Sequence, residues 1–400
     1  MNKLKELSLR LHAVSVMRDL LEDKVIKALM NFLDLADEAN EADKVDAYTF
    51  FVSELYKTSE ESLSDYVKKI VFESENVYVK LKGKGEVPSA VLSKSLENEL
   101  KTFDEVASLS AEELLSEFDF LPRYYTGKCN ISKEYIKRLD NISKYGYGIY
   151  AKYRMFYIGE DGQITPVQNP DETKLSDLID YEREQKVIMD NTKALLSGKP
   201  AANILLTGDA GTGKSSTVKA VVNELCDNGL RIIEVRKEQL HGIPKILDEL
   251  NTNPLKFILF IDDLSFTKDD DNFSALKAIL EGSVSAKSNN VVIYATSNRR
   301  HLVKESFSDR EGDDVHFNDT MQEILSLSER FGIQLTFSRP DKATYLDIVH
   351  NLADKQGIAY DTEKLDTAAE KFALKRGTRS ARAAKQFIDG IVAGSITDIR

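Results

Sequence analysis

A glycine-rich stretch near the middle of the chain contains one lysine and several hydroxyl side chains. Residues 208–216 read GDAGTGKSS and fit the pattern G-x-x-x-x-G-K-[ST]. In such a loop, backbone N–H groups and the start of the following helix face the phosphates of a nucleotide. Lys214 would reach the β- and γ-phosphates, and the Ser215 hydroxyl would ligate Mg²⁺. The predicted nucleotide-binding residues of the loop are Gly208, Asp209, Ala210, Gly211, Thr212, Gly213, Lys214, Ser215 and Ser216.

Two adjacent carboxylates follow an apolar run downstream of this loop. Residues 257–261 read FILFI, the pattern of a buried strand, and Asp262 and Asp263 come directly after them. We expect Asp262 to hold Mg²⁺ opposite Ser215, directly or through water. Asp263 would lie beside the γ-phosphate, where a carboxylate can orient and polarise an attacking water. The alternative is an acidic strand end without a chemical role.

Another apolar run ends in a polar side chain. Residues 291–297 read VVIYATS, and Asn298 follows them. An amide at this position can hydrogen-bond the γ-phosphate and the attacking water. We therefore predict Asn298 as a further catalytic residue, and the other interpretation is an asparagine that caps the next turn.

Arg330, in the sequence SERFG, precedes the last apolar strand of the chain. An arginine at a helix end can reach the nucleotide of a neighbouring subunit and stabilise the charge of its transition state. This role predicts a homo-oligomer with Arg330 at the interface. The alternative is a surface ion pair between Arg330 and a neighbouring acid such as Glu329.

Arg379 opens the last predicted helix, in the sequence GTRSAR. It would lean onto the β- and γ-phosphates from a C-terminal domain, and Arg382, one turn further on, is the competing candidate. Both arginines belong to a basic segment, residues 371–385, that contains no acid. We favour a nucleotide-facing and subunit-facing role for this segment over DNA binding.

Apolar strands that alternate with helices must position these residues. A parallel sheet covered by helices on both faces is the arrangement that this alternation predicts, because the strands are apolar throughout. The five predicted strands span residues 204–206, 231–235, 257–261, 291–295 and 333–337, and a helix is predicted over 217–225.

The regions before and after the sheet have a different character. Residues 1 to about 145 show apolar residues at helical spacing, and two short strands at 153–158 and 163–167 flank a glycine turn, which predicts a β-hairpin. After Pro340, helices are predicted over 343–355, 362–374 and 380–392. We expect a mainly helical N-terminal region ending in the hairpin (1–170), an α/β core (171–340) and a helical lid (341–400).

Composition restricts the classes of function. The net charge of −12 argues against a protein that coats nucleic acid. Cys129 and Cys226 lie far apart, and the five histidines lack metal-ligand spacing, so neither a disulfide framework nor a metal cluster is expected. No apolar run is long enough for a transmembrane helix, and the first residues lack a signal-peptide core. We expect a cytoplasmic protein without a membrane partner.

The order of these motifs resembles that of AAA+ ATPases over residues 176–400. The resemblance implies an AAA+ P-loop NTPase core with a small helical lid, and ATP and Mg²⁺ as cofactors. It assigns Asn298 to sensor 1, Arg330 to the arginine finger and Arg379 to sensor 2. It also places Ile179 and Tyr181 where AAA+ proteins contact the adenine.

Four segments are similar to a narrower family, the bacterial AAA+ ATPases filed as domain of unknown function 815. These segments are GKPAAN (198–203), IDDLSF (261–266), ATSNRRH (295–301) and SDREGDDVH (308–316). The last has no standard AAA+ role: it would form a substrate or subunit contact, a solvated loop or, as a remote alternative, a metal site through its carboxylates and His316.

Two departures from the AAA+ pattern bear on activity. Asp263 stands where a glutamate is usual and is one methylene shorter, which predicts slower hydrolysis. Residues 237–253 lack the aromatic pore-loop motif of a threading unfoldase.

Three functions follow in order of preference. The first is an oligomeric ATPase that remodels an unidentified protein partner, with the helical region as adaptor. The second is a helicase-loader-like or transposition-type ATPase acting at DNA, against which the net charge weighs. The third is a slow nucleotide-dependent binding switch. A small-molecule kinase ranks last, because Asn298, Arg330 and Arg379 would then share no purpose.

Overall fold

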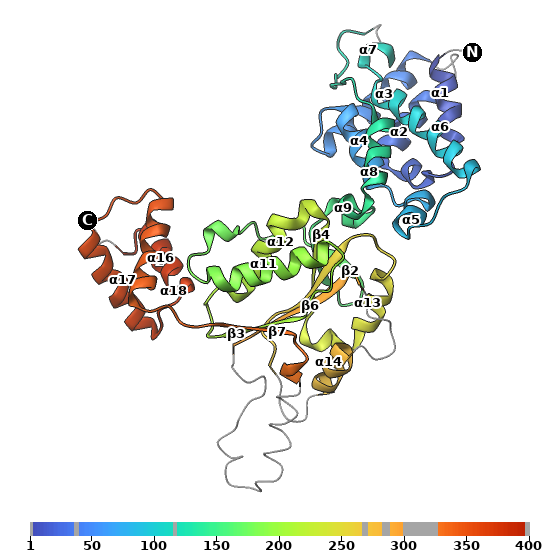
Figure 1. Cartoon of the computed structure of the whole chain (residues 1–400). Helices are drawn as coiled ribbons and strands as arrows, with labels where there is room; N and C mark the ends of the chain where they lie inside the picture. Colours follow the sequence, from blue (N-terminus) through green and yellow to red (C-terminus); the bar gives the residue numbers. More distant parts are fainter. Residues whose placement is uncertain are drawn as a thin grey trace. The chain divides into compact units, whose positions relative to one another are not determined.

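The protein is described here from a computed structural model, over residues 3–35, 40–114, 118–265, 271–281, 289–298 and 327–396. Its backbone forms two compact units (Figure 1). The first comprises Met1–Tyr153 together with Thr252–Leu255, and the second comprises Arg154–Asn251 and Lys256–Arg400.

Over its described residues the first unit is mainly helical, as the apolar spacing predicts. Its helices are α1 (Lys3–His12), the 3₁₀ helix η1 (Arg18–Glu22), α2 (Lys24–Leu33), α3 (Glu41–Lys57), α4 (Leu63–Glu73), α5 (Val77–Gly83), α6 (Ala90–Ala107), α7 (Ala111–Leu114), α8 (Ile131–Asp140), α9 (Ile142–Tyr145) and α10 (Ile149–Lys152).

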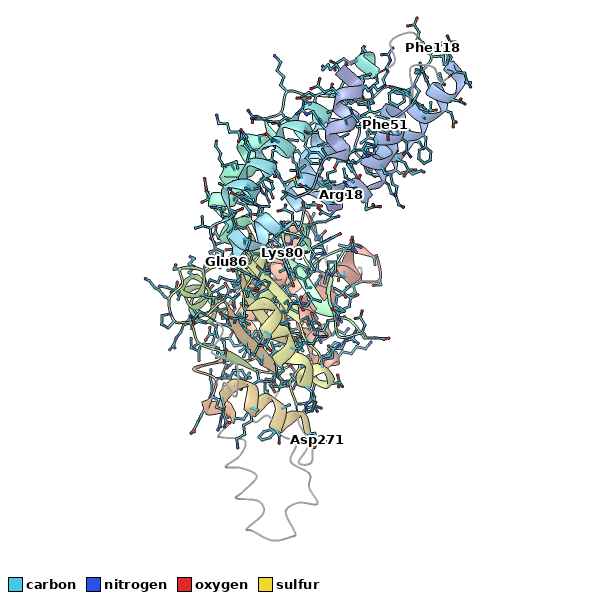
Figure 2. All side chains as sticks on the ribbon, turned by 90° about the vertical axis from the view of Figure 1, so that its right-hand side faces the viewer. Arg18, Phe51, Lys80, Glu86, Phe118 and Asp271 are labelled. Carbon is cyan, nitrogen blue, oxygen red and sulfur yellow. The ribbon has the colours of Figure 1, made fainter. Side chains whose placement is uncertain are left out.

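Capping and apolar spacing explain the local structure of this unit. The Asp23 carboxylate accepts hydrogen bonds from the N–H groups of Val25 and Ile26, which begins α2. Apolar residues then recur along α2 and join one continuous core. Phe51 of α3 is fully buried in that core (Figure 2). The helices are therefore held by packing rather than by propensity alone.

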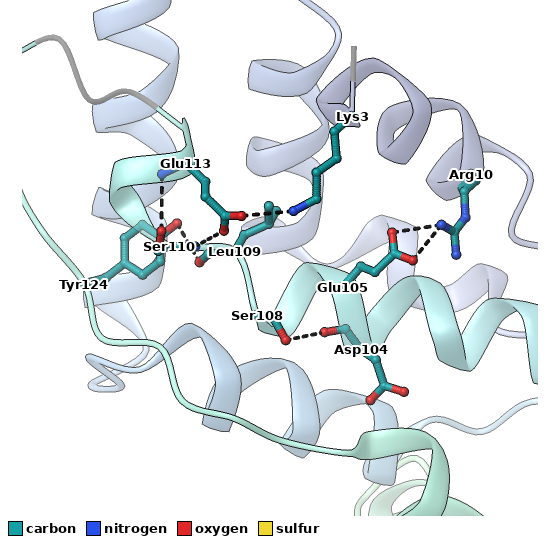
Figure 3. A network of polar contacts seen from close by, with 9 residues as sticks. All are labelled: Lys3, Arg10, Asp104, Glu105, Ser108, Leu109, Ser110, Glu113 and Tyr124. Atoms are coloured by element: carbon teal, nitrogen blue, oxygen red, sulfur yellow. Dashed lines mark hydrogen bonds and ion pairs between the residues drawn. The ribbon is translucent and has the colours of Figure 1, made fainter. Parts of the chain in front are cut away.

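Ion pairs join helices that are distant in sequence. Lys3 and Arg10 of α1 pair with Glu113 of α7 and Glu105 of α6, respectively (Figure 3). Ser110 and Glu113 form a reciprocal capping box at the start of α7: the Ser110 N–H donates to the carboxylate, and the Glu113 N–H donates to the hydroxyl. These exposed contacts add to the apolar core that lies beneath them.

The second unit contains a seven-stranded sheet in the order β2-β1-β4-β5-β6-β3-β7. Its strands are β1 (Met155–Ile158), β2 (Ile164–Pro166), β3 (Ile204–Gly208), β4 (Leu230–Glu234), β5 (Lys256–Ile261), β6 (Val291–Ser297) and β7 (Ile333–Phe337). The five predicted strands are all present and parallel.

The prediction of a five-stranded sheet is wrong in one respect, because the β-hairpin extends the sheet. β1 and β2 pair antiparallel as predicted, and β1 also pairs in parallel with β4, in the register Phe156 to Ile233. Met155 and Phe156 of β1 are buried, as expected for a strand inside a covered sheet. A two-stranded hairpin is only marginally stable by itself, and pairing with β4 gives it a third strand.

Helices cover both faces of the sheet. α11 (Glu182–Leu196) and α12 (Lys214–Leu225) pack on one face through buried Ile188, Val218 and Val221, and Figure 1 shows α13 (Ile243–Leu250) on the other side. Short 3₁₀ helices and one further helix complete the core: η2 (Leu175–Asp177), η3 (Cys226–Asn228), η4 (Lys237–Gly242) and α14 (Asp271–Glu281), whose first residue Figure 2 labels. The fold is therefore an α/β core, with a mainly parallel sheet between helices.

Three helices follow the sheet close to their predicted positions: α16 (Lys342–Lys355), α17 (Thr362–Arg376) and α18 (Ala381–Val392). Asp341, Asp361 and Ser380 cap their N-termini. A separate apolar core, which includes Tyr345 and Phe387, joins the three helices. Within the described part of the chain, no helix is long and apolar enough to cross a membrane.

Candidate active site

The glycine-rich loop connects β3 to α12, as predicted. Gly208, the last residue of β3, has φ +137°, and a Cβ there would lie 2.1 Å from the backbone oxygen of Phe337 in β7. No side chain fits between these strands at this position, so only glycine lets the loop leave the sheet here. Asp209, Ala210, Gly211, Thr212 and Gly213 form the turn, and Lys214, Ser215 and Ser216 form the first turn of α12.

Lys214 is only 5% exposed, and its ammonium group lies against the loop's own carbonyl oxygens. It donates to the backbone oxygens of Gly208 and Asp209, each at 2.8 Å, and to Oδ1 of Asn298 at 3.0 Å. Burial lowers the pKa of Lys214 below the usual lysine value, and the carboxylates of Asp262, Asp209 and Asp263 oppose this shift. The ammonium is thus held where three hydrogen-bond acceptors converge.

Ser215 and Asp262 come together although they belong to different elements. The Ser215 hydroxyl donates to Oδ1 of Asp262 at 2.6 Å. Thr296 of β6, which is 2% exposed, donates to the same carboxylate oxygen at 2.5 Å. A hydroxyl and a carboxylate are the hard oxygen ligands that Mg²⁺ takes in phosphate sites, so this donor set fits the predicted metal.

Asp263 has a backbone conformation that is uncommon for a residue with a side chain. Its φ is +54°, in the left-handed region. Its N–H donates to Oγ1 of Thr296 at 2.9 Å, and the N–H of Leu264 donates to the backbone oxygen of Thr296 at 2.7 Å. Hydrogen bonds to β6 therefore hold this turn in place, as strained backbone requires.

The Asn298 side chain links Lys214 of the glycine-rich loop to Asp263, which follows β5. Its Nδ2 donates to Oδ1 of Asp263 at 2.6 Å, while its Oδ1 accepts from Lys214. The chain of contacts runs from the lysine through the amide to the carboxylate, across the carboxyl ends of β3, β5 and β6. Of the predicted catalytic residues, the structure brings Asp263 and Asn298 together with the loop.

Arg330 forms its described ion pair outside this cluster. Its guanidinium donates a hydrogen bond to the carboxylate of Glu281, the last residue of α14. The ion-pair alternative for Arg330 thus has a partner in the structure, and that partner is Glu281 rather than the adjacent Glu329.

The two arginines of the GTRSAR sequence have different surroundings. Arg379 forms a two-point ion pair with Glu370 of α17, through Nε at 2.9 Å and Nη2 at 2.8 Å. Arg382 contacts the glycine-rich loop: its backbone N–H donates to the backbone oxygen of Gly211 at 3.3 Å, and a Cβ on Gly211 would lie 3.0 Å from the Arg382 Cβ. The positive charge of Arg382 also acts on the pKa of Lys214.

Ile179 and Tyr181 lie between the sheet and the three C-terminal helices. Ile179 packs against the apolar core of those helices, whereas Tyr181 packs against the core of the sheet. The Tyr181 ring lies 4.7 Å from that of Phe337, and its hydroxyl donates to the backbone oxygen of Ser338. The structure thus places both residues beside the connection between sheet and lid.

Several predicted features lie outside the described residues. They are Phe266, Arg299, Arg300, His301 and the whole 308–316 segment, including the metal-site alternative at His316. Among the described residues, no group of three or more histidine, cysteine, aspartate or glutamate side chains is arranged to hold a metal ion.

Two further residues, Thr296 and Arg339, contact the site and were not predicted from the sequence. Thr296 holds both Asp262 and Asp263 through one hydroxyl. A threonine near the end of an otherwise apolar strand was the available signal. Arg339 pairs with Asp209 of the glycine-rich loop, with its Nε 3.0 Å from Oδ2 and its Nη2 3.2 Å from Oδ1. Its position directly before Pro340, at the predicted domain boundary, was the only hint.

Comparison with known proteins gives a family match that spans the sheet and the three C-terminal helices. A family model described as "Protein of unknown function (DUF815)" matches residues 150–395. No curated protein matches the chain. Among solved structures, the RuvB Holliday junction branch migration motor of Thermotoga maritima is 14% identical with a TM-score of 0.34, covering 54% of this chain and 71% of that one. A chain of the E. coli MS115-1 HORMA:CdnC:Trip13 complex is 12% identical with a TM-score of 0.35, covering 54% and 89%.

Proposed function

Because the chain belongs to the DUF815 family, whose description assigns no activity, we propose its function from its own residues: it binds ATP with Mg²⁺ and hydrolyses it as an AAA+ ATPase. One observation carries this proposal. Ser215 contacts Asp262, and Lys214 contacts Asn298, which contacts Asp263, all at one edge of the sheet beside the phosphate loop.

Lys214 would bind the β- and γ-phosphates. In the structure its ammonium group donates to two loop carbonyl oxygens and one amide oxygen. Phosphate oxygens are stronger acceptors for an ammonium group than neutral carbonyls are. The incoming triphosphate therefore exchanges these contacts for charge-assisted hydrogen bonds, and the loop N–H groups complete the cradle.

Ser215 and Asp262 would hold Mg²⁺, with Thr296 fixing the carboxylate. When bound, the ion neutralises charge on the phosphate oxygens. Asp263 would orient the attacking water and accept its proton, and Asn298 would hold the Asp263 carboxylate in position. General-base assistance of this kind contributes about 10²–10⁴-fold to a rate.

A direct test separates binding from hydrolysis. We expect the wild-type protein to release phosphate from ATP only with Mg²⁺ and the Lys214→Met protein to lose nucleotide binding. Asp263→Asn should still bind ATP but hydrolyse it about 10²-fold more slowly or worse. Asp227→Asn, on the short helix η3, is a matched control and should leave the rate unchanged. Hydrolysis that survives Asp263→Asn unchanged would refute the assignment.

We further propose that Arg330 completes the site of a neighbouring subunit in a homo-oligomer. Since Arg330 pairs with Glu281 within its own chain, assembly would exchange that partner for the neighbour's γ-phosphate. A mixing experiment tests this role. Lys214→Met subunits keep Arg330 but lack a working glycine-rich loop. Arg330→Ala subunits keep the loop but lack the arginine. A mixture of the two inactive proteins should regain activity; if it stays inactive, Arg330 does not act between subunits.

Arg382 is our preferred lid arginine for the phosphates, in place of Arg379. The ion pair with Glu370 occupies Arg379, whereas the backbone N–H of Arg382 donates to the backbone oxygen of Gly211 in the loop. Arg382→Gln should therefore weaken ATP binding more than Arg379→Gln does. If Arg379→Gln weakens ATP binding more than Arg382→Gln does, Arg379 is the lid arginine that contacts the phosphates.

The client is proposed to be a protein bound through the helical unit. Large apolar side chains are exposed on this unit, among them Phe50 at 54%, Phe120 at 75% and Tyr125 at 70%. Affinity capture with the Asp263→Asn protein in ATP should enrich a partner that Lys214→Met does not retain. An ATPase rate raised by DNA at low salt would instead favour the DNA-linked alternative.

A slow switch is the second candidate, and the Asn298–Asp263 contact favours it. The amide holds the shorter carboxylate at 2.6 Å, which restrains the group that must reach the water. Asp263→Glu supplies the missing methylene. If hydrolysis then rises severalfold, the wild-type protein is adapted to slow turnover; an unchanged or lower rate favours the remodelling ATPase.

A further inference from the structure

The phosphate loop contains a negative charge of its own. Asp209 follows Gly208 directly, so its carboxylate lies beside the backbone groups that are expected to receive phosphates. Its charge acts on the pKa of Lys214 within the site. A fixed anion next to a triphosphate opposes binding, because like charges repel.

Arg339 compensates this charge. Two of its nitrogens face the two carboxylate oxygens of Asp209: Nε lies 3.0 Å from Oδ2, and Nη2 donates to Oδ1 at 3.2 Å. This is the two-point geometry in which arginine binds a carboxylate most firmly. Both side chains are about half exposed, at 56% and 47%, so the pair can open without disturbing a buried core.

The position of Arg339 links this charge compensation to the lid. Arg339 lies between β7, which ends at Phe337, and α16, which Asp341 caps. On the side of the sheet, Tyr181 anchors this connection through its ring on Phe337 and its hydroxyl on Ser338. Past Ser338, the chain passes through buried Pro340 into the lid. Any rotation of the lid about this connection changes the orientation of Arg339.

The lid contacts the same loop at a second point. The N–H of Arg382 donates to the backbone oxygen of Gly211, and a Cβ on Gly211 would lie 3.2 Å from the Ser380 hydroxyl. Lid and connection thus hold the loop at two residues, Gly211 and Asp209. A change in the orientation of the lid would therefore act on both contacts.

We propose that the Asp209–Arg339 ion pair sets the affinity for the triphosphate and makes it depend on the orientation of the lid. With the pair formed, the Asp209 charge is neutralised and ATP binds. When the connection turns Arg339 away, the uncompensated carboxylate repels the phosphates and nucleotide is released. This inference rests on the proposed binding of ATP and adds to it the residues that regulate that binding.

Equilibrium binding of fluorescent ATP and ADP analogues to four proteins tests the proposal: wild type, Arg339→Gln, Asp209→Asn and the double variant. We expect Arg339→Gln to weaken ATP binding about tenfold, which is 1.4 kcal/mol, and ADP binding less, because ADP carries less charge. Asp209→Asn should bind ATP at least as tightly as the wild type. The double variant should return to the wild-type affinity, since removing the anion makes the cation unnecessary.

Three results would overturn the proposal. If Arg339→Gln binds as the wild type does, the pair has no effect on affinity. If the double variant stays as weak as Arg339→Gln alone, Arg339 contacts the nucleotide itself. If the matched variant Arg10→Gln, which breaks an arginine–glutamate pair of the helical unit, weakens binding equally, the effect is one of net charge. A wild-type protein that binds no ATP removes the proposed function as well, whereas these three results leave it intact.

Discussion

Thr296 offers a sharp test of how the sheet positions the two carboxylates. Its hydroxyl donates to Asp262 at 2.5 Å and accepts the N–H of Asp263 at 2.9 Å, and the residue is 2% exposed. Thr296→Val keeps the shape of the side chain and removes both hydrogen bonds. Asp262 then loses a donor, and the left-handed turn at Asp263 loses one of the bonds that hold it.

The magnitude follows from these two contacts. A hydrogen bond to a charged group contributes about 1.5–3 kcal/mol, and a buried N–H left without an acceptor costs about 1–3 kcal/mol. Because both aspartates are exposed, we take a combined cost of about 2–4 kcal/mol. If the cost falls on the transition state, hydrolysis slows about 30- to 1,000-fold, at 1.36 kcal/mol per decade.

Steady-state phosphate release over a range of Mg²⁺ concentrations, together with thermal unfolding, measures the effect. Thr296→Val should slow turnover and raise the Mg²⁺ concentration that is required, because Asp262 is no longer fixed. Thr296→Ser keeps the hydroxyl and loses only a methyl group, so it should unfold at a slightly lower temperature and retain turnover within a few-fold. If the serine and valine proteins share the same rate, the hydroxyl does not position the carboxylates.

Three further predictions concern stability. Glu99 is 6% exposed and accepts hydrogen bonds from the N–H groups of Ser15, Val16 and Met17. Glu99→Ala should therefore lower the free energy of unfolding, measured in urea titrations, by about 3–5 kcal/mol. Glu97→Ala, on the exposed face of the same helix, should change it little. Gly208→Ala should abolish nucleotide binding and lower the melting temperature, because its Cβ would meet the Phe337 oxygen. Gly357→Ala, at an open position with φ +64°, should lower the free energy of unfolding by only about 1 kcal/mol. Hydrogen bonds from Arg379 hold the pKa of Glu370 below its ordinary value of 4.5. The pair therefore stabilises the lid above pH 4.5, and this stability is lost as the pH falls through the lowered pKa. Thermal melts in acid should show the loss in the wild type and not in Glu370→Gln.

Much of the fold was predictable because its signals are local. Each apolar run becomes a strand where the sequence places it, and the P-loop pattern fixes the turn before α12. The convergence of Asp262, Asp263 and Asn298 was also predictable, because the carboxyl ends of parallel strands meet at one edge of a sheet.

The rest depends on contacts between distant residues. Arg379 and Arg382 lie three positions apart on the chain and look equivalent in the sequence. Glu370, on a different helix, binds the first and leaves the second beside Gly211. The pairing of β1 with β4 likewise depends on a strand far along the chain, so no local pattern distinguishes an isolated hairpin from one that extends the sheet.

Residues 252–255 have a consequence for dissecting the protein into fragments. They belong to the helical unit, yet they directly precede β5, the strand that ends at Asp262. Leu255 is fully buried there, against Gly146, whose φ of +67° and lack of a side chain leave room for it. A deletion of residues 1–153 therefore removes the cover of Leu255 and exposes an apolar side chain directly before β5. Truncation and limited proteolysis will report on both units at once, and point substitutions are the cleaner tool for assigning roles to either.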